Sequence, residues 1–234
     1  MPTPSKKSTL AATPEMTPGT TPARLERAFY ERDALEVAPD LLGKLLCRGS
    51  VVLRISEVEA YCYPDDSANH CRMGRTARNQ PMWGPAGHAY VYLCYGMHHM
   101  LNIVTNRDGE GAAVLIRACE LVSGHDLVAA RREGITGPNA LTGPGKVGAA
   151  LGLTLQSSGV SLCDGSDLYL LDAPRPARIL HGPRVGIGYA SIAHQRAPWR
   201  FALADSAWVS HRKTLAPMRN RRSLVTAAAS GRSS

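Results

Sequence analysis

The stretch Ser56-Glu57-Val58-Glu59-Ala60-Tyr61 places two carboxylates and a phenol at alternate positions. Polar and apolar residues alternate from Leu53 to Tyr61, which predicts a β-strand with Glu57, Glu59 and Tyr61 on one face. A carboxylate held in this way can accept a proton from water and can stabilise a cationic, oxocarbenium-like transition state. Because acids are costly to bury, we expect this face to line a cleft or to contact solvent.

Short strands and helices are expected to position this strand. The runs Leu45–Arg48 and Val51–Tyr61 flank the two-residue connection Gly49-Ser50, which predicts a β-hairpin. Pro39 is expected to open a helix that leads into the first of these strands. Further periodic runs predict helices at Gly124–Glu133 and Val147–Leu151 and strands at Ala112–Ala118, Leu168–Leu171, Ala177–Leu180, Arg184–Ile187, Arg200–Leu203 and Trp208–Ser210.

The segment Ala68–Gly87 has little apolar periodicity and is rich in arginine, asparagine, glycine and proline. It carries His70, Arg72, Arg75 and Arg78. A loop of this length inside a compact domain is usually functional or disordered. Basic side chains so near the acidic strand favour a functional loop.

A second hairpin is predicted after this loop. His88–Leu93 alternates with Tyr90 and Tyr92 on one face, Cys94-Tyr95-Gly96-Met97 is expected to turn, and Met100–Thr105 returns. Tyr95 then stands at the tip. An exposed aromatic there can act as a wedge or a stacking surface, or it can fold back onto its own hairpin; the sequence leaves both open.

The composition is that of one globular domain with a basic surface. The chain has 234 residues, 44% hydrophobic and 20% charged, and a net charge of +8. Only five of the 27 basic residues are lysine. Arginine suits bidentate phosphate contacts, so nucleic acid is the first candidate partner, beside the alternative of an ordinary basic soluble protein.

Neither a metal site, a cofactor nor a membrane span is expected. No pair among the six cysteines forms a CxxC motif, which favours free thiols in a reducing compartment. Cys62, His70 and Cys71 could be imagined as metal ligands, but no fourth ligand stands at a recognisable spacing from them. No run is long or apolar enough to cross a bilayer. We therefore expect a cytoplasmic monomer, associated with the nucleoid if the chain is bacterial.

The two ends of the chain differ from its middle. Residues 1–22 are rich in proline, threonine and serine and are expected to be disordered. Residues 212–234 form a basic tail that is expected to be flexible. The folded domain is therefore expected to span residues 23–211.

A glycine-rich turn, Thr142-Gly143-Pro144-Gly145-Lys146, precedes one of the predicted helices. It is a poor match to a nucleotide-binding P-loop, because Val147 stands where that motif needs serine or threonine. Lys146 at a helix start can still hold one phosphate of a larger polyanion.

Several motifs together resemble the alkyladenine (3-methyladenine) DNA glycosylase family, in order and at nearly the family's spacings. The resemblance covers roughly residues 24–211. It is carried by the motifs Glu57-Val58-Glu59-Ala60-Tyr61, Ala68-Asn69-His70, Arg78-Asn79, Tyr90-Val91-Tyr92, Tyr95-Gly96-Met97, Asn102-Ile103, Val114-Leu115-Ile116-Arg117, Gly143-Pro144-Gly145-Lys146, Arg184-Val185-Gly186-Ile187-Gly188 and Ser206-Ala207-Trp208-Val209-Ser210.

The resemblance implies a role for each matching residue. Glu59 would activate a water molecule, with Arg117 helping to organise that water or a nearby phosphate, and Tyr95 would enter the minor groove as a wedge. The pocket for an extruded base would be formed by Tyr61, His70, Tyr92 and Asn102. DNA contacts would come from Arg78 and Lys146. The implied fold is α+β, a single domain with a curved, mostly antiparallel sheet, surrounding helices and a protruding β-hairpin.

The implied reaction is base-excision repair of damaged purines in double-stranded DNA. The implied substrates are 3-methyladenine, 7-methylguanine, hypoxanthine and ethenoadenine, and the product is an abasic site. Because water is the nucleophile, the enzyme would be monofunctional and would not cut the strand.

Two rival functions differ in what they leave unexplained. A glycosidase on free nucleosides or sugars could use Glu57 and Glu59 as its carboxylate pair, but the basic surface and Tyr95 would have no purpose. A non-catalytic module for damaged or bent DNA would use Tyr95 alone, but a carboxylate facing phosphates would then only weaken binding.

Overall fold

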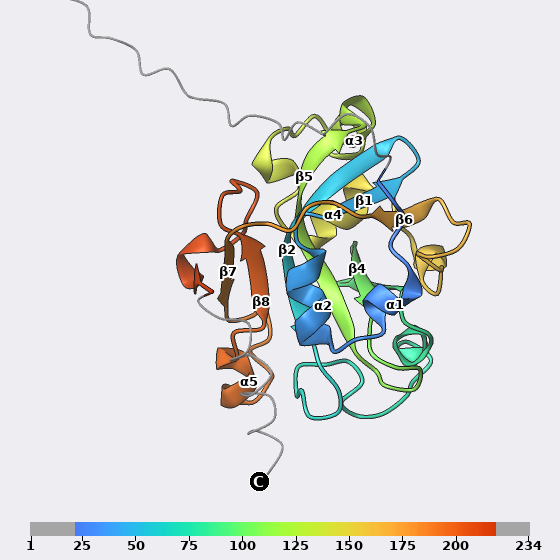
Figure 1. Cartoon of the computed structure of the whole chain (residues 1–234), viewed down its shortest axis with the longest axis vertical. Helices are drawn as coiled ribbons and strands as arrows, with labels where there is room; N and C mark the ends of the chain where they lie inside the picture. Colours follow the sequence, from blue (N-terminus) through green and yellow to red (C-terminus); the bar gives the residue numbers. More distant parts are fainter. Residues whose placement is uncertain (1–21, 219–234) are drawn as a thin grey trace, which may run out of the picture.

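Strand β2 (Val51–Tyr61) lies near the centre of the sheet and carries the acidic motif (Figure 1). The computed structural model describes residues 22–218. On one side β2 pairs with β5 (Ala113–Ser123). On the other side it pairs first with β1 (Leu45–Arg48) and then with β8 (Arg200–Leu203). Glu57 and Glu59 lie in the half of β2 that pairs with β8, so a late segment of the chain reaches the acidic motif.

All strand pairs of the nine-stranded sheet are antiparallel. The order is β3-β4-β5-β2-β8-β7-β9, and β1 links β2 to β6. The remaining strands are β3 (Ala89–Cys94), β4 (His98–Val104), β6 (Leu168–Leu171), β7 (Ile179–Gly182) and β9 (Ala216–Pro217). The structure thereby confirms a single α+β domain with an antiparallel sheet.

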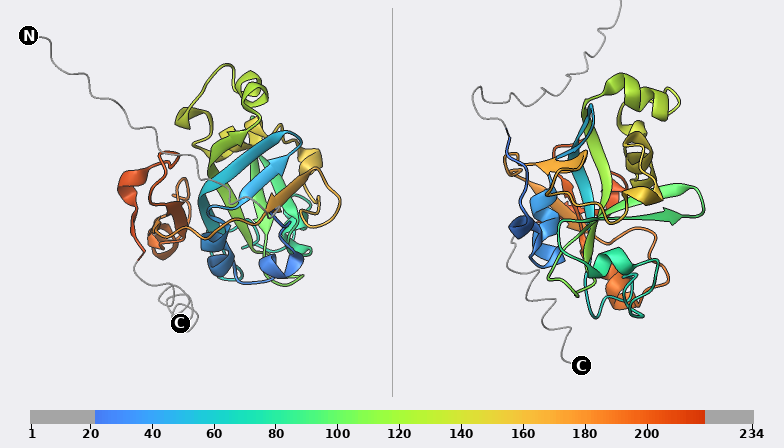
Figure 2. Two further views of the ribbon diagram at one scale, coloured as in Figure 1. Left: turned by 45° about the horizontal axis from the view of Figure 1, so that its top comes forward. Right: turned by 90° about the vertical axis from the view of Figure 1, so that its right-hand side faces the viewer.

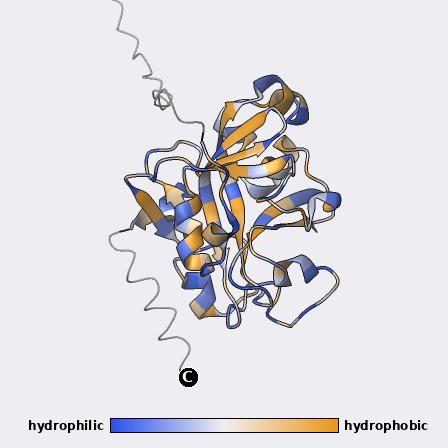
Figure 3. Ribbon diagram, turned by 45° about the vertical axis from the view of Figure 1, so that its right-hand side comes forward, coloured by the Kyte–Doolittle hydropathy of each residue, from blue (hydrophilic) through white to orange (hydrophobic). Residues whose placement is uncertain are grey.

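Short helices surround the sheet (Figure 1). The α-helices are α1 (Arg27–Tyr30), α2 (Ala34–Leu41), α3 (His125–Arg131), α4 (Pro144–Ala150) and α5 (Ile192–Arg196). The 3₁₀ turns are η1 (Gln80–Trp83), η2 (Pro138–Ala140), η3 (Leu155–Ser157) and η4 (Arg212–Thr214). Apolar residues concentrate in the central strands and in the helix faces against them (Figure 3), and they form one main buried core.

The hairpin β3–β4 projects from the body of the domain (Figure 2, right, in green). Its first strand is at the edge of the sheet, while β4 pairs with β5 and contacts α4. The close approach of α4 needs glycine: a Cβ on Gly148 would stand 2.0 Å from the carbonyl oxygen of His99, and one on Gly145 would stand 2.9 Å from the His98 side chain. These two glycines let α4 pack against the hairpin close to its turn, because His98 and His99 pair with the last two residues of β3.

Four predicted strands have the observed bounds, namely β1, β2, β6 and β8, but the helix prediction at Pro39 was wrong. Helix α2 begins earlier, because Asp33 accepts a hydrogen bond of 2.8 Å from the amide of Leu35 and caps the helix. Pro39 lies inside that helix. The predicted strands at Arg184–Ile187 and Trp208–Ser210 are loops, and the sequence patterns did not predict α5.

The expected ends of the domain need one correction. Regular structure continues beyond residue 211: η4 follows, and β9 pairs with β7 through Leu180–Pro217 and His181–Ala216. The tail expected from residue 212 is therefore part of the fold as far as residue 218. The disorder and flexibility expected for residues 1–21 and 219–234 concern segments outside the described residues.

Candidate active site

Glu59 is fully buried, and each of its two carboxylate oxygens has a polar partner. The hydroxyl of Tyr61 donates to Oε2 at 2.9 Å. The backbone amide of Val185 donates to Oε1 at 2.7 Å, and Nη1 of Arg117 lies 3.3 Å from the same oxygen. Since a carboxylate offers about four acceptor positions, three such contacts fix its orientation and leave room for roughly one more donor.

Glu57 lies on the same side of β2 but has a different environment. Its Oε1 is 2.8 Å from Nη1 of Arg200 and 3.3 Å from Nε of Arg117. Ser210 donates to Glu57 twice, from its amide at 2.7 Å and from its hydroxyl at 2.9 Å. These contacts satisfy the carboxylate, so Glu57 is a structural anion rather than a free partner for Glu59.

Of the two alternatives expected for the acidic face, a cleft or contact with solvent, the second is therefore wrong. Glu57, Glu59 and Arg200 are fully inaccessible, and Arg117 is 6% exposed. Arginines brought by β5 and β8 compensate the two acids, which makes their burial possible. Burial opposes the charge on Arg117, but Glu59 and then Glu57 raise its pKa, so Arg117 stays a cation between the two carboxylates.

Tyr61 is a hydrogen-bond donor over the whole physiological pH range. Burial, followed by the charge of Glu59, raises the pKa of its hydroxyl well above the usual value. Tyr92 also raises the pKa of Tyr61. The pKa of Tyr92 is itself raised by burial, then by Cys94, Tyr90 and Tyr189, and then by Glu59. The acid, Tyr61 and Tyr92 thus lie in one electrostatic environment.

A hollow of about 330 Å³ lies next to Tyr92, because His70 and Tyr90, whose rings neighbour that of Tyr92, are among its lining residues. Its lining includes one imidazole, two phenols and two guanidinium groups: His70, Arg72, Thr76, Arg78, Asn79, Tyr90 and Tyr189. Aromatic and arginine side chains around a space of this size suit a flat heterocycle.

His70 is half-buried and stands against the tyrosines of β3. Its ring lies edge-to-face with Tyr92 at a centroid distance of 4.6 Å, and its Nδ1 is 3.0 Å from the hydroxyl of Tyr90. Burial, and then the charges of Arg78 and Arg72, lower the pKa of His70 to about 4. His70 is therefore neutral at pH 7 and can offer a hydrogen bond but not a positive charge.

Asn102 is directly behind the β3 tyrosines. It is 4% exposed, pairs with Tyr90 across β3 and β4, and donates from Nδ2 to the Tyr90 carbonyl at 3.2 Å. This bond fixes the amide of Asn102 against the backbone of Tyr90, whose side chain lines the hollow.

Tyr95 is 87% exposed and lies in the turn that joins β3 to β4. Tyr95 and Gly96 both have left-handed φ angles, 51° and 71°, and the amide of Met97 donates to the Cys94 carbonyl at 3.2 Å. These are features of a type I′ turn, which holds the ring away from the sheet. Of the two alternatives for Tyr95, the structure shows the exposed one.

The two predicted DNA-contacting cations are on different elements. Arg78 is exposed, lies 5.4 Å from the centroid of the Tyr92 ring, and donates to the Leu93 carbonyl at 3.4 Å. Lys146, near the start of α4, is half-buried and donates to Oδ1 of Asn139 at 2.7 Å. Only Arg78 of the two lines the hollow.

Sequence patterns missed several residues that hold this site. Arg200 and Ser210 come from the last third of the chain, where no spacing connects them to β2. Arg184 pairs with Asp66 at 2.5 and 2.8 Å, with both side chains inaccessible. The only signal for Arg184 was its place beside Val185 in a glycine-rich motif.

Within residues 22–218 no cluster of three or more histidine, cysteine, aspartate or glutamate side chains could hold a metal ion. In the same residues no helix is long and apolar enough to cross a membrane.

A family model described as methylpurine-DNA glycosylase matches residues 28–207. The chain is 54% identical over 193 residues to a "DNA-3-methyladenine glycosylase" of Arabidopsis thaliana, covering 81% of this chain and 76% of that protein. It is 58% identical over 189 residues to a protein of Nitrosococcus oceani named "Putative 3-methyladenine DNA glycosylase", covering 81% of this chain and 94% of the other.

The class of protein that this fold and these matches define is the DNA glycosylases, hydrolases of the N-glycosidic bond. The chain belongs to the methylpurine-DNA glycosylase family. This confirms the resemblance inferred from the motifs.

Proposed function

We propose that the protein removes damaged purines from duplex DNA, with a water molecule activated by Glu59 as the nucleophile. The observation that carries this proposal is the environment of Glu59. Two hydrogen bonds, from the Tyr61 hydroxyl and the Val185 amide, and an ion pair with Arg117 fix its carboxylate, and roughly one acceptor position is left for a water proton. A carboxylate oriented in this way is suited to general-base catalysis and to stabilising a cationic sugar.

A base inside a duplex cannot reach a buried carboxylate, so the nucleotide must rotate out of the helix. Tyr95 is proposed to fill the resulting gap, because it is the exposed aromatic at the tip of a hairpin that projects from the domain. The extruded base would stack between Tyr61 and the aromatic side chains of His70 and Tyr92, with Asn102 behind it. Arg78 and Lys146 would contact phosphates.

The site favours leaving groups that already carry a positive charge. His70 is neutral at pH 7, and burial is the largest cause that raises the pKa values of Tyr61, Tyr90 and Tyr92. None of these four is an effective proton donor to a leaving purine. We therefore propose N3- and N7-alkylated purines as the main substrates, and slower release of neutral hypoxanthine and ethenoadenine.

The reaction is proposed to end at an abasic site with the strand intact. The residues that line the hollow include no lysine that could form a Schiff base. Lys146 is engaged with Asn139. The protein would act inside the cell, as a monofunctional enzyme of base-excision repair.

The test is release of free base by the wild type and by Glu59→Gln. Two duplexes are used, one alkylated with a methylating agent and one with a single hypoxanthine. The introduced glutamine can keep the local bonds, because its oxygen accepts from Val185 and the Tyr61 hydroxyl can accept from its amide. We expect base release to fall by about 10²- to 10⁴-fold in Glu59→Gln, while duplex binding persists.

Glu120→Gln is the matched control, since Glu120 is also a strand glutamate paired with an arginine, Arg54. It should release base at the wild-type rate. Unchanged release in Glu59→Gln would exclude Glu59 as the base. Binding of damaged duplex without release by the wild type would favour the rival non-catalytic module.

A further inference from the structure

The side chain of Arg184 is completely buried beside the catalytic motif, in the loop between β7 and α5. Its guanidinium forms a two-bond ion pair with Asp66 and donates to the carbonyl of Ala60 at 2.9 Å. Ala60 stands between Glu59 and Tyr61. A single cation thus reaches the backbone of β2 at the point where the proposed base and the proposed stacking residue are attached.

The same guanidinium lies over two aromatic rings. Its Cζ is 4.7 Å from the centroid of Tyr61 and 4.9 Å from that of Trp199. Such contacts fix the plane of a ring as well as its position. Trp199 is itself attached to β2, since its carbonyl accepts from the amide of Ala60 at 2.9 Å.

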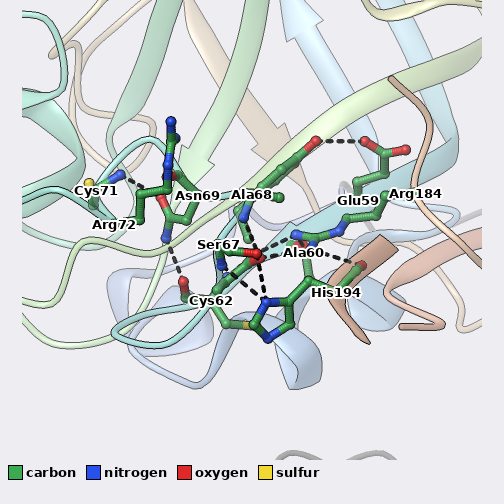
Figure 4. A network of polar contacts seen from close by, with 12 residues as sticks. Glu59, Ala60, Cys62, Ser67, Ala68, Asn69, Cys71, Arg72, Arg184 and His194 are labelled. Atoms are coloured by element: carbon green, nitrogen blue, oxygen red, sulfur yellow. Dashed lines mark hydrogen bonds and ion pairs between the residues drawn. The ribbon is translucent and has the colours of Figure 1, made fainter. Parts of the chain in front are cut away.

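Asp66 extends this network to the loop that carries His70. Its carboxylate accepts from the amides of Cys62 and Ala68 at 3.2 and 3.0 Å. Figure 4 shows Arg184 between Glu59 and the residues of this loop. The ion pair therefore connects the side of the site that contains the acid to the side that contains the histidine.

The residue after Arg184 completes the connection. The amide of Val185 donates the 2.7 Å bond that fixes Oε1 of Glu59. This segment has no regular secondary structure, so its position depends on side-chain anchors. One buried anchor is Arg200, which donates to the Pro183 carbonyl at 2.7 Å. The other is Arg184, and a change there would move the Val185 amide and the Tyr61 ring together.

We propose that Arg184, through its pair with Asp66, is a positioning residue for base release, which sets the orientation of Tyr61 and of the Val185 amide toward Glu59. The inference rests on the proposed function of Glu59. It assigns Arg184 no contact with the substrate. Its effect belongs to the chemical step, because Tyr95, Arg78 and Lys146 are on other elements and remain free to bind DNA.

The test is Arg184→Lys, which keeps the charge but loses the planar fork and the stacking faces. Single-turnover release of base from alkylated duplex is measured at saturating enzyme, per folded molecule, well below the melting temperature. We expect the rate to fall by on the order of 10²-fold, as for a small misplacement of reacting groups. The Kd for an undamaged duplex should change by less than about threefold.

Arg178→Lys is the matched control, since Arg178 also pairs with an aspartate, Asp205, but on the surface. It should behave as wild type. Asp66→Asn is the second variant, because it removes the charge and keeps the shape. It should also slow release without weakening DNA binding.

The proposal would be overturned if Arg184→Lys or Asp66→Asn folds and releases base at a rate within about threefold of that of Arg178→Lys. Arg184 would then only stabilise the fold. Loss of folding in both site variants would overturn it as well, for the same reason. The wild type and Glu59→Gln are measured beside them. If the wild type releases base and Glu59→Gln does not, the proposed function stands whatever Arg184 does.

Discussion

The phenolic oxygen of Tyr61 lies 2.9 Å from Oε2 of Glu59, two residues away on the same strand. Burial and the nearby carboxylate raise the pKa of this phenol and keep it protonated, so Tyr61 donates and Glu59 accepts. The contact joins a residue proposed to stack on the base to the residue proposed to activate water. Tyr61 would therefore have two separable roles, one of its ring and one of its hydroxyl.

Tyr61→Phe separates these roles. The ring remains, while Oε2 of Glu59 loses a donor in a buried site. We expect single-turnover base release to fall by roughly 10- to 100-fold and the free energy of unfolding to fall by about 1.5–3 kcal/mol. Tyr63→Phe is the control, because Tyr63 is a half-buried tyrosine whose ring packs on Trp83. Equal rates for the two variants would assign Tyr61 to stacking alone.

Glu57 and Glu59 are expected to differ in what their loss costs. Glu57 accepts from Arg200, Arg117 and Ser210, so Glu57→Gln leaves buried arginines undercompensated. We expect Glu57→Gln to lower the free energy of unfolding by about 3–5 kcal/mol, or the melting temperature by about 10 °C. Urea and thermal unfolding of Glu57→Gln and Glu59→Gln measure this difference in stability.

The result also tests the rival glycosidase function. That function needs both carboxylates in the chemistry, whereas the contacts of Glu57 assign it to the fold. A Glu57→Gln protein that keeps its stability but loses base release would favour a carboxylate pair. Base release per folded molecule that stays near the wild-type rate would support a structural Glu57.

Much of the sheet could be predicted because its signals are local. The bounds of β1 and β2 follow from alternating residues around the Gly49-Ser50 turn, and the tip of the tyrosine hairpin follows from Tyr95-Gly96. The start of α2 was missed because its capping residue, Asp33, outweighs the proline signal at Pro39. Two local patterns predicted different starts for this helix, and the side-chain cap at Asp33 sets the observed one.

The site was only half predictable, for a physical reason. Alternation on β2 correctly placed Glu57, Glu59 and Tyr61 together, but it implied exposure because a strand pattern carries no information on compensating charges. Those charges come from Arg200 and Arg117, which meet Glu57 and Glu59 only in the folded chain. Burial of an acid depends on partners distant in sequence, and no spacing rule supplies them.

Gly148→Ala should disturb the β3–β4 hairpin without changing a residue that lines the hollow. A Cβ at Gly148 would stand 2.0 Å from the His99 carbonyl oxygen, so α4 and β4 must separate. We expect a loss of about 1–3 kcal/mol in the free energy of unfolding and weaker binding to duplex DNA, measured by urea titration and by fluorescence anisotropy. In the control Gly84→Ala, the nearest atom would be at an ordinary 3.5 Å, so neither quantity should change. Unchanged DNA affinity in a destabilised Gly148→Ala would show that hairpin position does not limit binding.

Tyr95→Asn should separate stability from function. Tyr95 has a φ of 51°, a conformation that costs most residues roughly 1–2 kcal/mol and that asparagine adopts more easily. We expect the thermal stability of Tyr95→Asn to equal or exceed that of the wild type. Base release should fall strongly for a paired lesion and less for the same lesion in single-stranded DNA, where no gap needs filling. Equal losses on both substrates would contradict the wedge role, and Tyr95→Phe should retain most activity on both.

His70 predicts how stability depends on pH. Burial, and then Arg78 and Arg72, lower its pKa to about 4 from an ordinary value of 6.5. Between these values the unfolded chain binds a proton that the folded chain does not, so stability falls as pH falls from 6.5 to 4. The contribution of this one group is about 3 kcal/mol over that interval. His70→Gln should flatten the decline in the free energy of unfolding, measured by urea titration at about pH 7.5, 5.5 and 4.5, and parallel curves for the two proteins would show that His70 titrates normally.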